Sequence, residues 1–109
     1  MATLIDVLNE MLKGRETYME LTGGLRLQYR QADGENPNCR LLCYRIGTVG
    51  PSDRELVTVR QHVEALLPAG TAVRLEPEFE YVGGDSLTRH CRAFTWQPAP
   101  TQAALFGGA

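Results

Sequence analysis

The amino-acid sequence predicts an α+β domain, in which two helices pack against a four-stranded, mainly antiparallel sheet in the order α-β-β-α-β-β. Two segments carry apolar residues at helical spacing behind a capping residue. Four other segments have the pattern of strands, and turn residues divide them into two hairpins, each preceded by a helix. These observations place a single domain at residues 1–96 and a proline-containing tail, which we expect to be flexible, at residues 97–109.

The first predicted helix covers residues 3–13. Thr3 can cap it, and Asp6 three residues later completes a variant of the capping box. Gly14 is a natural stop. Residues 15–22 fit either a further helical turn or a short strand, so this segment stays open. The apolar stripe of this helix is formed by Leu4, Leu8, Met11 and Leu12.

The second predicted helix begins after Ser52, because Ser52 and Glu55 have the spacing of a capping box. Pro68 ends it. Arg60 and Glu64 are four residues apart and can form an ion pair on its surface. Its apolar stripe is formed by Leu56, Val59, Val63 and Leu66.

The first hairpin is predicted from residues 25–31, which alternate between apolar and polar, and residues 39–46, a nearly continuous apolar run typical of a central strand. The second joins residues 71–82 and 87–96 through a glycine-containing turn. Pro77 interrupts the longer of these two strands. Because proline has no N–H to donate, that strand is expected to lie at an edge or to be bulged there.

The composition excludes several classes of protein. The chain has 109 residues, 43% of them apolar, and a formal charge of −2, which argues against coating of nucleic acid by bulk charge and against a polybasic membrane binder. No apolar run approaches the roughly 18–20 residues that span a bilayer. The first residues lack the pattern of a signal peptide, and the cysteine count is odd, so we expect reduced thiols and a cytoplasmic location.

The cysteines and histidines do not form a convincing reactive or metal site. Cys39 and Cys43 would lie about 13 Å apart on a strand, whereas two thiolates on one zinc ion lie within about 4 Å. His90 and Cys91 are neighbours on a strand and therefore point to opposite faces, so His90 cannot activate Cys91. We therefore expect no catalytic residues, no metal and no cofactor, and hence no enzyme.

Nucleic-acid binding by the sheet is one alternative. The candidate contacts with single-stranded nucleic acid are Arg26, Arg30, Arg74 and Arg92, if they share an exposed face. Phe94 or Trp96 would supply rings for stacking, although both also suit a core. An acidic row on the strand at residues 71–82 would weaken the positive electrostatic potential of these arginines. This row consists of Glu76, Glu78 and Glu80.

The sharpest sequence feature lies in the tail. Gln102-Ala103-Ala104-Leu105-Phe106 resembles the peptide by which bacterial polymerases and repair proteins bind the sliding clamp. That peptide consists of a glutamine, two spacer residues, and Leu or Met followed by Phe. The resemblance implies that the Gln102 amide contacts the rim of a pocket, while Leu105 and Phe106 fill it.

Three hypotheses follow from the sequence. The favoured one is a non-enzymatic accessory of DNA replication or repair, or a mobile-element inhibitor, that binds the clamp through Gln102, Leu105 and Phe106. The alternative for the tail is that Leu105 and Phe106 pack against the core of their own domain. The second hypothesis is a module that binds single-stranded nucleic acid, and the third is a structural or oligomerising domain whose acidic first helix packs on a partner; the sequence leaves the oligomeric state open.

Overall fold

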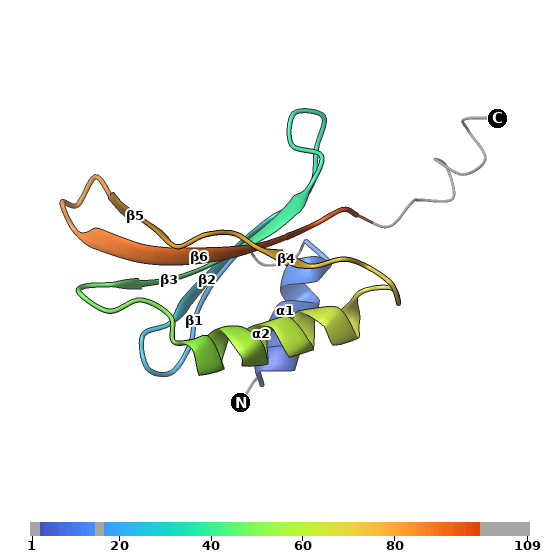
Figure 1. Cartoon of the computed structure of the whole chain (residues 1–109), viewed down its shortest axis with the longest axis horizontal. Helices are drawn as coiled ribbons and strands as arrows, with labels where there is room; N and C mark the ends of the chain where they lie inside the picture. The colour runs from blue at the N-terminus through green and yellow to red at the C-terminus, as the bar shows by residue number, and fades with distance from the viewer. Residues whose placement is uncertain (1–2, 15–16, 99–109) are drawn as a thin grey trace.

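The computed structural model describes residues 3–14 and 17–98, and it contains two helices that lie on the same face of one antiparallel sheet (Figure 1). The mixed α/β class, the two helices and the antiparallel pairing are confirmed. The predicted number of strands is wrong, because the sheet has six strands. The elements are α1 (Leu4–Leu12), β1 (Tyr18–Glu20), β2 (Arg26–Arg30), β3 (Cys39–Ile46), α2 (Asp53–Leu66), β4 (Arg74–Leu75), β5 (Phe79–Val82) and β6 (Thr88–Trp96).

One additional strand comes from the segment that the sequence left open, and the other comes from the division of a predicted strand into two. β1 lies in the segment left open between helix and strand, and it pairs with β2. The predicted strand at residues 71–82 is divided into β4 and β5, which pair with successive parts of β6. The break lies at Pro77, as the missing N–H of proline leads one to expect. The strand order is β1-β2-β3-β6-β4, with β5 also pairing with β6.

Both helices begin with the capping boxes that the sequence predicts. The Thr3 hydroxyl accepts from the Asp6 backbone N–H, and the Asp6 carboxylate accepts from the Thr3 backbone. Ser52 and Glu55 form the same reciprocal pair at the start of α2. These bonds satisfy backbone donors that the first helical turn leaves unpaired. The predicted ion pair between Arg60 and Glu64 is present at 3.3 Å.

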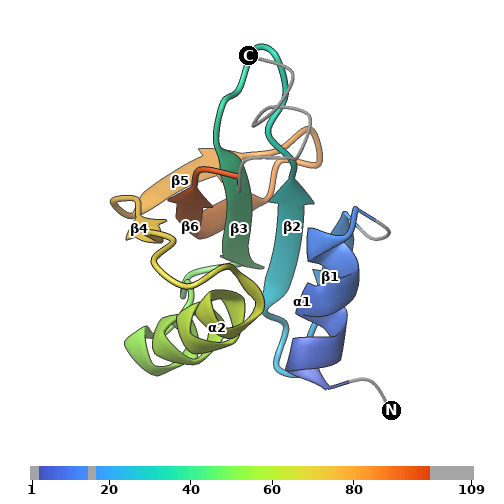
Figure 2. The same ribbon diagram turned by 90° about the vertical axis from the view of Figure 1, so that its right-hand side faces the viewer.

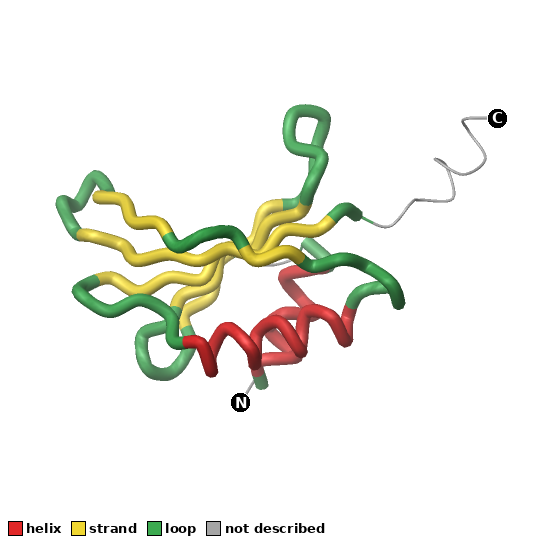
Figure 3. Tube along the Cα trace, viewed as in Figure 1, coloured by secondary structure: helices red, strands yellow, loops and turns green. Residues whose placement is uncertain are grey.

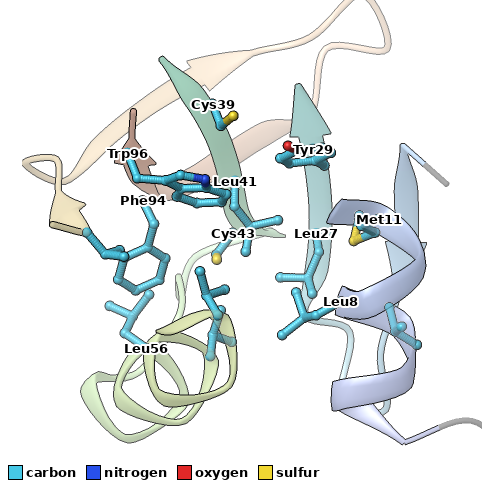
Figure 4. Close-up of a cluster of buried hydrophobic side chains, with 14 of the residues drawn as sticks. Leu8, Met11, Leu27, Tyr29, Cys39, Leu41, Cys43, Leu56, Phe94 and Trp96 are labelled. Carbon is cyan, nitrogen blue, oxygen red and sulfur yellow. The ribbon is translucent and has the colours of Figure 1, made fainter. Parts of the chain in front are cut away.

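The main core lies between the helices and the sheet (Figures 2 and 3). Leu8 and Met11 of α1 lie next to Leu27, whereas Leu56 of α2 lies beside Phe94 (Figure 4). Burial of these side chains supplies the principal driving force for folding. The fully buried side chains of this core are Leu8, Met11, Leu27, Leu41, Cys43, Val59, Val63 and Phe94. No described helix is both long and apolar enough to cross a lipid bilayer.

Candidate functional site

The face of the sheet opposite the helices is the main candidate surface in the described part of the chain, and we call it the open face. Residues directly opposite each other in an antiparallel sheet share a face. Tyr44 lies opposite Arg26 on one side and Cys91 on the other, and Cys91 lies opposite Phe79. All four side chains therefore belong to the open face.

Three arginines line up across one end of the open face, and we call Arg30, Arg40 and Arg74 the arginine row. Arg30 is opposite Arg40, while Arg40 and Arg74 are both opposite Thr95. With strands about 4.8 Å apart, the row extends over about 14 Å. Arg30 and Arg74 are exposed and form no salt bridge with any described residue, whereas Arg40 binds a carboxylate oxygen of Glu76 at 2.9 Å.

Two hollows flank the arginine row. One, of about 290 Å³, is lined by Gln28, Tyr29, Arg30, Arg40 and Leu42. The other, of about 610 Å³, lies where the last described residues leave β6. Its lining is mostly polar and includes Asn38, Thr71, Arg74, Thr95 and Gln97.

A small apolar cluster lies in the middle of the open face. Both described helices lie on the opposite face of the sheet, so neither covers it (Figure 1). It consists of Leu42, Tyr44, Cys91 and Ala93, with Ile46 and Phe79 packed against it. Arginine side chains lie over the aromatic rings around this cluster. The Arg40 guanidinium lies 5.4 Å from the ring centroid of Phe79, and that of Arg89 lies 5.7 Å from the ring centroid of Tyr81. Long arginine stems can thus shield apolar surface while the charged groups stay in water.

The structure separates the four arginines that were candidate nucleic-acid contacts. Arg26, Arg30 and Arg74 lie on the open face. Arg92 lies opposite Cys43 on the face that the helices cover, and its Nε donates to the backbone carbonyl of Glu76 at 3.0 Å.

The two rings expected beside those arginines lie in the core instead. Phe94 is fully buried and Trp96 is 3% exposed, and Trp96 stacks on Tyr29 with ring centroids 6.1 Å apart. Neither ring can offer its face to a base. The sequence did contain this alternative, because both residues have the size of core side chains.

The predicted acidic row does not exist as a single row. Glu76 lies on the open face and pairs with Arg40. Glu80 is opposite His90, which in turn is opposite Arg45, so Glu80 lies on the other side of the sheet. The Glu80 carboxylate lies 3.2 Å from Nδ1 of His90. Glu78 lies with Glu80 and His90 around a separate hollow of about 250 Å³.

The cysteines are buried thiols. All three, Cys39, Cys43 and Cys91, are free. Burial raises the pKa of Cys43 to about 12, and burial also raises the pKa of Cys91. A thiol with a raised pKa is protonated at neutral pH and is a poor nucleophile. Across residues 3–14 and 17–98, no three His, Cys, Asp or Glu side chains gather closely enough to hold a metal ion.

Arg45 of β3 connects the start of α2 with two neighbouring loops. Its guanidinium binds both carboxylate oxygens of Glu55 at 2.5 and 2.6 Å, and it also donates to the carbonyls of Gly23 and Gly50. Hydrogen bonds from Arg45, with smaller contributions from Ser52, lower the pKa of Glu55 to about 2. This cluster therefore fastens the start of α2 to two loops of the sheet.

The tail residues predicted to bind a partner, Gln102, Leu105 and Phe106, lie outside the described part of the chain. The described part ends at Gln97 and Pro98, which are both exposed. The chain therefore leaves β6 at the protein surface.

Comparison with known proteins adds no relative. No protein family, no curated protein and no solved structure matches this chain.

Proposed function

We propose that this protein is a non-enzymatic binding protein that docks on the bacterial sliding clamp through Gln102-Ala103-Ala104-Leu105-Phe106. The observation that carries the proposal is the spacing of this segment: a glutamine, two small spacer residues, and an adjacent Leu and Phe. Two neighbouring apolar side chains that enter one pocket can supply most of the binding energy of a short peptide.

The position of the segment supports the proposal. It follows β6 by a short spacer that contains Pro98 and Pro100, and Gln97 and Pro98 are exposed. Leu105 and Phe106 are the only large apolar residues after Trp96. The tail also has no charged side chain, so recognition would depend on apolar contacts and on the Gln102 amide rather than on electrostatic attraction.

The test is a titration of purified clamp with the full chain and with a Leu105→Ala/Phe106→Ala double variant, observed by calorimetry. Each truncation in the pocket is expected to cost about 2 kcal/mol, or about thirtyfold in Kd. An Ala103→Ser/Ala104→Ser variant changes only the spacer residues and is the matched control. Equal binding by all three proteins, or no binding by the full chain, would refute the proposal.

A thermal unfolding measurement on the same proteins separates docking from self-packing. If the tail binds only the clamp, the double variant unfolds at the same temperature as the full chain. A drop of several degrees would place Leu105 and Phe106 in the domain's own core, because loss of buried apolar contacts lowers stability. Such a drop would count against the clamp.

The accessory and inhibitor forms of the proposal differ in their effect on clamp-dependent DNA synthesis. A protein that occupies the pocket to block polymerases inhibits synthesis when it is added in excess over the clamp. An accessory that shares the clamp leaves synthesis unchanged at equimolar amounts. The double variant should have no effect in either case.

A further inference from the structure

The break at Pro77 exchanges the two faces of the outer strand. Leu75 lies opposite Phe94 and faces the helices, whereas Phe79 lies opposite Cys91 on the open face. In a continuous strand, residues 75 and 79 would share a face, because side chains alternate with a period of two. The break shifts the alternation by one, which is equivalent to a one-residue slip of β5.

This exchange changes the chemistry of the open face. It brings Phe79 and Tyr81 onto the same surface as the arginine row, and it turns Glu80 to the opposite side of the sheet. Tyr81 is 39% exposed. Of the three predicted acidic residues, only Glu76, between β4 and β5, then remains on the open face beside the arginines.

The charges on the open face favour an anionic partner. Three of the five arginines on the open face lie close to a carboxylate. Arg40 pairs with Glu76, Arg26 lies 3.9 Å from Glu20, and Arg89 binds Asp85 at 2.8 Å. No such bridge within residues 3–14 and 17–98 engages Arg30 or Arg74. The five arginines are Arg26, Arg30, Arg40, Arg74 and Arg89.

We propose that the open face binds single-stranded nucleic acid, with phosphates on the arginine row and bases stacked against Tyr81, Phe79 and the arginines that lie over them. Guanidinium groups match phosphate oxygens through paired hydrogen bonds. Aromatic rings and guanidinium planes both serve as stacking surfaces for unpaired bases, which a duplex does not offer. The hollow beside Arg30 and Arg40 provides space next to the row. This site is independent of the tail, so it stands whether or not the clamp proposal does.

The first test is fluorescence anisotropy of a labelled single-stranded oligothymidylate with the full-length protein over a series of salt concentrations. Three phosphate contacts predict a slope of log K against log salt of about −2 for a single strand. An Arg30→Gln/Arg74→Gln variant should weaken binding at least about tenfold at low salt and reduce the slope by about 1.4. Both side chains are exposed, so the variant is expected to fold normally.

The matched control removes two charges from the other side of the molecule. Lys13 and Arg54 are exposed residues of the helical layer, and Lys13→Gln/Arg54→Gln changes the net charge by the same amount. This control should bind within about twofold of the unchanged protein. An equal loss in both variants, or no salt-dependent binding by the unchanged protein, would overturn the proposal.

Further measurements test stacking and the kind of partner. Tyr81→Ala should lower affinity by about fivefold or more without changing the salt slope, because stacking on a ring involves no counterion release. Tighter binding of a duplex of the same length would overturn the single-strand assignment. Equal binding of a polyglutamate peptide would assign the face to acidic protein segments instead. Repeating the titration with an oligouridylate of the same length shows whether the open face prefers RNA or DNA.

Discussion

The two faces of the sheet are buried by different means. On the helix-covered face, Leu27, Leu41 and Phe94 are fully buried under α1 and α2. On the open face, Cys91 and Ala93 are equally buried although neither helix lies over them. Here Ile46 and Phe79 of the same face pack against them, and Arg40 in turn lies over the Phe79 ring.

Because of this difference, one face of the sheet stabilises the fold and the other remains accessible to a ligand. A helix cannot leave its face without unfolding the domain, because the core is shared between both layers. The contact of an arginine with a ring contributes only about 1 kcal/mol at an exposed site, and ion pairs near the surface add little, so this cover can rearrange without unfolding the domain. The helix-covered face is thus committed to folding, whereas the open face keeps a surface that a ligand can reorganise.

Replacing one phenylalanine on each face gives the largest contrast. Phe94→Ala should lower the free energy of unfolding by about 3–5 kcal/mol, because it leaves a cavity in the main core. Phe79→Ala, the matched change on the open face, should cost only about 1–2 kcal/mol, since Phe79 is half-buried and the loss includes one contact with Arg40. Urea denaturation of both variants measures the difference. Equal losses would mean that the open face is as firmly packed as the core.

Replacing one arginine on each side gives a smaller contrast. Arg45→Met breaks the paired bonds to Glu55 and two bonds to backbone carbonyls, so it should destabilise the domain by about 1–3 kcal/mol. Arg40→Met removes a pair with Glu76 and a contact with the Phe79 ring, both near the surface, and should cost about 1 kcal/mol. The same urea titrations apply. A larger loss for Arg40→Met would show that the open face depends on its arginine cover more than its geometry suggests.

Acid should weaken the Arg45 cluster, because Glu55 must be charged to pair with Arg45. The pKa of Glu55 is lowered from 4.5 to about 2 in the folded protein. Its contribution is therefore fully present above about pH 4.5 and is lost as the pH falls towards 2. The urea midpoint should drop over this range, and Arg45→Met should drop less because the pair is already broken. An identical acid profile for both proteins would rule out Glu55 as the cause.

Local sequence signals predicted the elements whose pattern is self-contained. The capping box of Ser52 and Glu55 marked the start of α2, and the alternation of residues 25–31 marked β2. β1 was not resolved, since a strand of three residues beside a helix end has no distinctive pattern. The change of face after Pro77 could not be predicted from the sequence either, because residues 78–81 show the same alternation of apolar and polar side chains on whichever face the apolar ones lie.

The arginine row could not be predicted for a related reason. It depends on the register of four strands, and register is a property of pairing rather than of any single segment. Arg40 in particular was hidden in the apolar run of β3, where neighbours on both faces are buried. The clamp-binding hypothesis for the tail differs from this, because it depends only on the order of five consecutive residues and not on how the domain folds.

The break at Pro77 also bears on how copies of the protein meet one another. A long unpaired strand edge is a template on which another chain can add a strand. Here the outer edge of the sheet is divided into two residues of β4 and four of β5, and the opposite edge, β1, has only three. Exposed Pro77 lies between the two short strands and offers no N–H to an incoming chain. The domain thereby leaves little edge on which aggregation could begin at high concentration.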